Sequence, residues 1–171
     1  MRHVVAIALL LSACAPTQPC ETCPPVPARI AVDVCVDDAF DAGDRAAIDR
    51  AAARWTAALC GLVTVDTRTV EDGDTRGCTR SILRVESGYE WVTLKQPCDA
   101  YHCVAGWTNA ARDTAWVIVD LVPLGMMEAV VAHEIGHLLG ADEGLQIMNP
   151  RLHDGCVDRR AAIQAAIGVT R

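Results

Sequence analysis

Alternating apolar and polar residues predict several short strands around one long helix in the first half of this chain. Residues 29–36, R-I-A-V-D-V-C-V, alternate and are rich in β-branched side chains, which predicts a strand. Residues 41–59 carry apolar side chains at helical spacing and are rich in alanine, so they predict a long helix that Gly61 closes. Alternation returns over 62–68 and 81–86, and each segment predicts a further strand.

In the second half, one continuous apolar run stands out. Residues 115–122, A-W-V-I-V-D-L-V, predict a buried strand that Pro123 ends. A helix is expected to begin near Leu124, a last helix spans about 158–167, and residues 89–94 are a candidate strand. This order predicts an α+β domain. We expect the four tryptophans in its core: Trp55, Trp91, Trp107 and Trp116.

Composition and length indicate one globular domain with an N-terminal extension. The chain is 51% hydrophobic and 22% charged, as in globular proteins. Residues 28–171 are long enough for one core and too short for two domains of typical size. Residues 14–27 are rich in proline, which predicts an extended tether. The net charge of -7 repels phosphate backbones, so we expect no nucleic-acid partner.

The N-terminus resembles a bacterial lipoprotein signal. Arg2 and His3 precede an apolar run over 4–11 that is too short to span a membrane, and the run ends in L-S-A-C. The resemblance implies that residues 1–13 are a signal peptide and that Cys14 is lipidated and anchors an exported protein in the cell envelope. Ala15, which is not aspartate, favours the outer membrane if the cell is Gram-negative. The alternative is an ordinary secretory peptide with Cys14 incidental.

Eight cysteines remain when Cys14 is set aside. In an oxidising compartment this even number predicts up to four disulfides, with a pairing that their order does not reveal. The alternative, a zinc or redox site at C-E-T-C over 20–23, is disfavoured because no second C-x-x-C follows at metal-site spacing and no helix follows the motif. The eight are Cys20, Cys23, Cys35, Cys60, Cys78, Cys98, Cys103 and Cys156.

The candidate chemistry lies in residues 133–150, H-E-I-G-H-L-L-G-A-D-E-G-L-Q-I-M-N-P. His133 and His137 are four residues apart, so on a helix they share a face and can bind one metal ion. Glu134 points along the same side and can reach a water held by that metal. Two nitrogen ligands, an open coordination position and a carboxylate base are the arrangement of a zinc hydrolase.

This stretch resembles the signature of the metzincin metallopeptidases, H-E-x-x-H-x-x-G-x-x-H followed by a methionine-containing turn. Gly140 matches the signature glycine, where the chain must leave the helix sharply, usually in a left-handed conformation. Met148 matches the Met-turn, which the resemblance implies is an apolar floor beneath the ligands. It also implies a metzincin-like zincin domain over 28–171, with a twisted mixed sheet, a long N-terminal helix, an active-site helix and a C-terminal helix.

The chain departs from the family pattern at the third ligand. Glu143 stands where most metzincins carry a histidine. A carboxylate is an acceptable zinc ligand, and two histidines with one glutamate form an established catalytic set. We therefore expect His133, His137 and Glu143 to bind Zn²⁺, with Asp142 and His153 as alternative ligands.

These residues predict a zinc-dependent endopeptidase that hydrolyses peptide bonds of extracytoplasmic proteins. Glu134 would take a proton from the zinc-bound water as it attacks the peptide carbonyl. The expected partners are a protein or peptide substrate and a membrane reached through the lipid anchor, and the expected state is a monomer. The alternative is a non-catalytic surface lipoprotein that zinc stabilises and that acts as a binding module. The intact Glu134 favours the enzyme.

Overall fold

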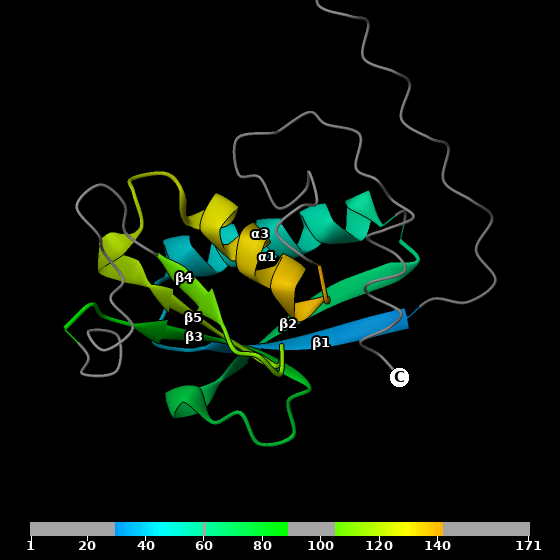
Figure 1. Ribbon diagram of the computed structural model, residues 1–171, viewed down its shortest axis with the longest axis horizontal. Coiled ribbons are helices and arrows are strands. Elements are labelled where there is room, and N and C mark those ends of the chain that lie inside the picture. The colour runs from blue at the N-terminus through cyan, green and yellow to red at the C-terminus, as the bar shows by residue number, and fades with distance from the viewer. Residues whose placement is uncertain (1–29, 60, 89–104, 142–171) are drawn as a thin grey trace, which may run out of the picture.

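The computed structural model describes residues 30–59, 61–88 and 105–141, which form a five-stranded sheet with two α-helices on one face (Figure 1). This arrangement confirms the predicted α+β class. The signal, the tether, the candidate strand at 89–94 and the helix expected over 158–167 lie outside the described residues. The elements are β1 Ile30–Asp37, α1 Ala42–Ala58, β2 Val63–Val70, β3 Arg80–Val85, β4 Gly106–Thr108, β5 Thr114–Ile118 and α3 Met127–Leu138, with short 3-10 turns η1 Glu71–Gly73 and η2 Val119–Leu121.

The sheet is mixed, with strand order β2-β1-β3-β5-β4. Strands β2, β1, β3 and β5 run parallel to one another, and β4 at the edge pairs antiparallel with β5. The long helix α1 is the crossover that two parallel neighbours, β1 and β2, require. Strand β4 ends the sheet on the side of α3, so an edge strand borders the helix that carries the histidine motif.

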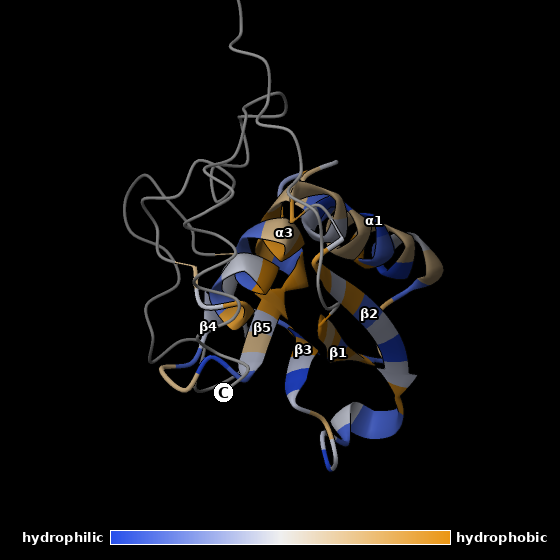
Figure 2. Cartoon of the chain, turned by 90° about the vertical axis from the view of Figure 1, so that its right-hand side faces the viewer, coloured by the Kyte–Doolittle hydropathy of each residue, from blue (hydrophilic) through white to orange (hydrophobic). Residues whose placement is uncertain are grey.

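The core lies between the sheet and the two helices, where apolar residues face one another (Figure 2). Trp55 of α1 is 1% exposed, as expected of a core residue, and its Nε1–H donates to the carbonyl oxygen of Ala132 in α3 at 2.7 Å. At the edge of the same contact, Arg50 of α1 pairs with Glu128 of α3 at 2.8 Å. The long helix therefore positions the motif helix directly.

The strand expected over 115–122 is shorter than predicted. Strand β5 ends at Ile118, and the next three residues form the turn η2. Within it, the Asp120 carboxylate accepts a hydrogen bond from the Ser87 backbone N–H at 2.8 Å and another from the Ser87 hydroxyl. Asp120 is thus an exposed polar residue bonded to the segment after β3, 33 residues earlier in the chain, and the strand ends two residues before it. The helix then begins at Met127 rather than near Leu124.

Strand β4 has only three residues, too few for an alternating pattern to predict. It exists because the turn that follows returns the chain to β5. The Asn109 side chain accepts from the backbone N–H of Asp113 at 3.1 Å and donates to its carboxylate at 2.7 Å. Arg112 takes a left-handed conformation, with φ of 58°. Asn and Asp residues that bond to their own turn are a common signal for tight reversals.

Two of the tryptophans expected in the core lie on the opposite face of the sheet. Trp107 and Trp116 pair in register on β4 and β5, and their rings stack with centroids 4.8 Å apart. Their strand neighbours Gly106 and Ala115 face the helices, so alternation directs both rings away, and both are only partly buried. The core expectation was therefore wrong for these two, and Trp91 lies outside the described residues.

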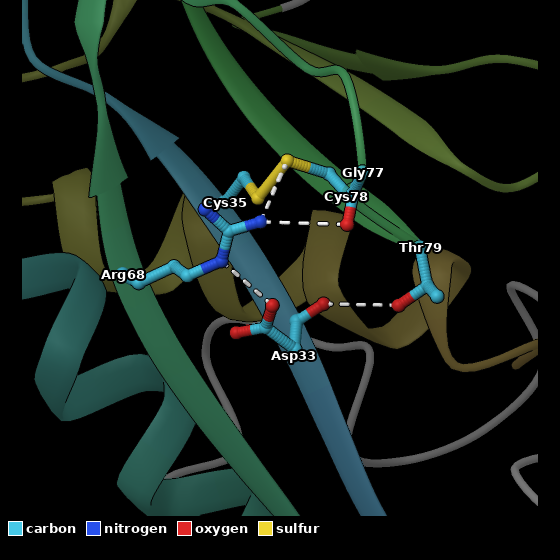
Figure 3. Close-up of polar contacts among 6 residues, drawn as sticks. All are labelled: Asp33, Cys35, Arg68, Gly77, Cys78 and Thr79. Carbon is cyan, nitrogen blue, oxygen red and sulfur yellow. Dashed lines mark hydrogen bonds and ion pairs between the residues drawn. A yellow bond between two sulfur atoms is a disulfide. The ribbon is translucent and has the colours of Figure 1, made fainter.

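One disulfide joins Cys35 of β1 to Cys78 in the loop before β3 (Figure 3). Arg68 of β2 lies across it: its guanidinium donates to the Asp33 carboxylate at 2.8 Å and approaches Cys78 Sγ at 3.3 Å. Cysteine pairing was expected, and this bond supports it. The other seven cysteines lie outside the described residues. Neither helix of the described part is long and apolar enough to cross a membrane.

Candidate metal centre

Helix α3 presents the three motif side chains to one cavity of about 500 Å³ beneath the edge strand. Residues of α3 line one side, and residues of β4 and the following turn line the other. The lining consists of Gly106, Trp107, Thr108, Asn109, Arg112, His133, Glu134 and His137. The structure thus brings together the two histidines and the glutamate that the sequence singled out.

The two imidazoles converge on one point. Nε2 of His133 lies 3.1 Å from Nε2 of His137, and the rings are perpendicular, with centroids 4.7 Å apart. Two nitrogens on one tetrahedral zinc ion at 2.0–2.1 Å are about 3.3–3.4 Å apart. The observed separation is close to this value, so the pair fits a shared metal ion.

A backbone carbonyl fixes the orientation of His137. Its Nδ1 lies 3.1 Å from the carbonyl oxygen of Ala141. A histidine that donates from Nδ1 to a carbonyl keeps the lone pair on Nε2, and this is how metal-ligating histidines are commonly oriented. The contact thus directs Nε2 of His137 toward His133 and suits a metal ligand.

The end of α3 supplies that carbonyl. Leu139 caps the helix, and Gly140 follows with φ of 86°, the left-handed conformation expected for this glycine. Gly140 N–H donates to His137 O, and Ala141 N–H donates to Gly136 O, both at 2.9 Å. These two bonds form a Schellman motif, which reverses the chain at once. The reversal places the carbonyl oxygen of Ala141 within hydrogen-bonding distance of Nδ1 of His137.

Two arginines, one in β3 and one in the turn between β4 and β5, bond to the same chain reversal. Arg80 of β3 donates through Nε to the carbonyl oxygen of Leu138 at 2.9 Å, and Arg112 donates to that of Gly140. Burial lowers the pKa of Arg80, and the charge of Asp113 partly opposes this shift. Both arginines bind carbonyls at the end of α3 that have no partner within the helix. No pattern in the sequence pointed to either arginine, because the contacts join distant parts of the chain.

Glu134 is buried, with 3% of its surface exposed, and lies against β4. The Thr108 hydroxyl donates to its Oε2 at 2.6 Å. A Cβ atom at Gly106 would lie 2.8 Å from both Cγ and Cδ of Glu134, so only glycine leaves room for this side chain. Sequence reasoning missed Thr108 and Gly106, because β4 was not predicted.

The remaining site residues of the prediction lie outside the described part of the chain: Cys14, Asp142, Glu143, Met148 and His153. Within residues 30–59, 61–88 and 105–141, no group of three or more His, Cys, Asp or Glu side chains is arranged to hold a metal ion. Of the candidate ligands, the structure therefore describes the histidine pair. The chain reversal at Gly140 leads directly into the segment that carries the third candidate.

A larger hollow, of about 590 Å³, lies beside the first and shares Arg112 with it. Residues from 75–81 and 111–114 line it, and no histidine is among the described residues there. The motif residues His133, Glu134 and His137 therefore line the smaller of these two cavities.

Comparison with models of known protein families gave no match, and comparison with curated proteins found no similar sequence. The function must therefore be argued from the residues of the site.

Proposed function

We propose that this protein is a zinc-dependent endopeptidase that hydrolyses peptide bonds of extracytoplasmic proteins. The observation that carries the proposal is the convergence of the His133 and His137 Nε2 atoms, 3.1 Å apart, beside the buried carboxylate of Glu134 in one cavity. A structural role alone needs the ligands but does not need a carboxylate beside them in an open cavity.

The ligand set of the proposal is His133, His137 and Glu143, with Asp142 and His153 as the alternatives for the third position. The two histidines fit a zinc ion by their spacing and by the orientation of His137. Zinc held there would supply a Lewis acid that polarises the scissile carbonyl and makes a bound water more acidic.

Glu134 is the general base of this proposal. Its carboxylate lines the same cavity as both imidazoles, so it can take a proton from the attacking water. The same carboxylate can then return the proton to the leaving amine, which must be protonated as the peptide bond breaks. Burial under β4 keeps bulk water from this carboxylate and strengthens its interactions.

The edge strand supports a peptide as the substrate. Strand β4 borders the cavity and pairs with β5 on one side, and no described strand pairs with its other side. An extended peptide can add to such an edge through backbone hydrogen bonds that do not depend on its sequence. This would place a peptide bond beside Glu134 and the histidines.

The finer fold class of the proposal is a metzincin-like zincin domain. The mixed sheet, the long helix α1 and a motif helix that ends at a left-handed Gly140 support it. We also propose that the protein is a monomer and is anchored to the cell envelope through Cys14. The Cys35–Cys78 disulfide supports an oxidising compartment.

The test compares wild type with Glu134→Gln, measuring zinc content by mass spectrometry and cleavage of casein and of a peptide library. Both proteins should bind one zinc ion, whereas hydrolysis by the variant should fall about 10²–10⁴-fold, because the amide cannot accept the proton. Cleavage by the variant at the wild-type rate would overturn the role of Glu134. Wild-type protein that holds zinc and cleaves nothing would favour the non-catalytic binding module.

The third ligand needs separate variants. Glu143→Ala should lower zinc affinity about 10-fold or more, whereas Asp142→Ala and His153→Ala should leave it close to wild type, because only a ligand contributes a bond to the metal. A competition titration with a chelator measures this. A larger loss in Asp142→Ala or His153→Ala would move the assignment to that residue.

A further inference from the structure

Two residues on the same face of β4 contact the side chain of Glu134. Gly106 and Thr108 are two residues apart on the strand, so both face α3, while Trp107 between them faces away. Gly106 leaves the space that the Glu134 side chain fills, and Thr108 donates its hydroxyl hydrogen to Glu134 Oε2 at 2.6 Å. The carboxylate is therefore held from the sheet as well as from its own helix.

The hydroxyl of Thr108 is well placed to orient a carboxylate. A hydroxyl that donates to an ionised carboxylate makes a short, charge-assisted bond, and a length of 2.6 Å agrees with this. Threonine is branched at Cβ, so its side chain has few rotamers. The strand is itself held by its pairing with β5, where Thr108 lies opposite Ala115. The donor thus occupies a defined position.

We propose that Thr108 is a positioning residue for the general base: its hydroxyl fixes Oε2 of Glu134 and so sets how the carboxylate faces the reacting groups. The inference rests on the proposed endopeptidase function. A glutamate side chain has three rotatable bonds, and a misplacement of about 1 Å can cost about 100-fold in rate. Because β4 also supports the peptide in this proposal, one strand would align the substrate and the base together.

The experiment uses the full-length zinc-loaded protein and three variants. Thr108→Val keeps the shape of the side chain and removes the donor, and Thr108→Ser keeps the donor. We expect Thr108→Val to lower kcat about 10–100-fold with KM within about 2-fold of wild type, and Thr108→Ser to stay within about 3-fold in both. Thr108→Ala, which also removes the donor, replaces Thr108→Val if that variant does not fold.

A second measurement is independent of turnover. With Co²⁺ in place of zinc, the visible absorption spectrum reports the ligands of the metal, one of which would be the water to which Glu134 bonds in this proposal. Thr108→Val should change this spectrum and Thr108→Ser should restore it, while the metal content of both stays at that of wild type. This comparison remains informative if wild type cleaves no peptide, an outcome that would reject the proposed function but not the positioning of Glu134.

Two results would overturn the inference. The first is a Thr108→Val protein with wild-type kcat or, if wild type is inactive, with a wild-type cobalt spectrum. The second is an equal fall in Thr108→Val and Thr108→Ser, because a role that the serine hydroxyl cannot restore is one of packing and not of hydrogen bonding.

Discussion

At the scale of single residues, the candidate site depends on positions without chemistry of their own. Gly106 contributes no functional group, yet a Cβ atom there would lie 2.8 Å from Cγ and Cδ of Glu134. Because Glu134 is buried, its side chain has little room to move aside. The observed position of Glu134, the proposed base, thus requires the absence of a side chain at Gly106.

Replacing Gly106 with alanine should separate metal binding from hydrolysis. We expect Gly106→Ala to displace the Glu134 carboxylate and to reduce peptide cleavage about 10-fold or more, while zinc content stays at one ion per chain. Cleavage rate and zinc content measured on the same preparation test this.

Gly88→Ala is the matched control, because a Cβ atom at Gly88 meets nothing within 4 Å. It should retain wild-type cleavage. Equal activities of Gly106→Ala and Gly88→Ala would show that Glu134 does not depend on the space at β4.

At the level of secondary structure, the backbone conformation at the end of α3 affects the orientation of a proposed metal ligand, His137. The left-handed Gly140 closes the helix and brings the Ala141 carbonyl to His137 Nδ1. A residue with a Cβ atom is strained in this conformation by about 1–2 kcal/mol. The orientation of the His137 ring therefore depends on a glycine three residues away.

Gly140→Ala should lower both stability and zinc affinity. We expect a loss of about 1–2 kcal/mol in the free energy of unfolding without metal, together with weaker zinc binding as the Ala141 carbonyl shifts. Urea unfolding and chelator competition measure the two effects.

Gly61→Ala is the control for strain alone. Gly61 follows α1 with φ of 67°, and a Cβ atom there would meet nothing within 4 Å. This variant should lose similar stability and keep its zinc affinity. If zinc affinity is unchanged in Gly140→Ala too, the helix end does not orient the ligand.

The turn between β4 and β5 makes a pH-dependent contribution to stability. The hydrogen bond from the Asn109 amide lowers the pKa of the Asp113 carboxyl below its ordinary value of 3.8, with smaller contributions from Thr114 and Arg80. A folded-state pKa below the unfolded value means that the stabilisation is fully present above pH 3.8 and is lost as the pH falls through the folded pKa.

Asp113→Asn should therefore destabilise the protein most near neutral pH, and this penalty should shrink at pH values below about 3.8. Urea unfolding of both proteins between about pH 2.5 and 7 measures the difference. A penalty that stays constant over this range would show that the carboxylate charge contributes nothing to the turn.

At the scale of the whole molecule, the disulfide stabilises the sheet without taking part in the site. Val34 and Val36 face the helices, so Cys35 between them faces away and its bond to Cys78 lies on the opposite side of the sheet from α3. The bond closes a loop with a sequence separation of 43 residues, which includes α1 and β2. Stability and metal binding should therefore respond separately to its removal.

The double variant Cys35→Ala/Cys78→Ala should lose about 2–4 kcal/mol in the free energy of unfolding, because the open loop gains conformational freedom in the unfolded chain. Zinc affinity of the folded protein should stay at the wild-type value. Thermal and urea unfolding, with chelator competition, test both statements. An unchanged melting temperature would contradict the stabilising role, and a loss of zinc in folded protein would contradict the separation.

The accuracy of the sequence-based prediction differed between kinds of element. The long helix, the strands β1, β2 and β3, and the motif helix follow patterns over six or more residues, and their predicted positions agree with the structure to within a few residues. The end of β5 was misplaced, because the apolar run continues past Ile118, where the strand ends. The tryptophans Trp107 and Trp116 were assigned to the core, because hydrophobicity alone does not say which face of a sheet a residue occupies.

Sequence patterns were enough to predict that His133 and His137 lie on one face of a helix with Glu134 beside them, and that Gly140 ends that helix. These are local properties, because helical spacing and a left-handed turn depend on neighbours a few residues apart. The cover of β4 over Glu134 could be seen only in the folded chain: the bond from Thr108 joins residues 26 positions apart, and Arg80 contacts Leu138 across 58 positions. Contacts over such distances arise from strand order and helix packing, which no short pattern in the chain encodes.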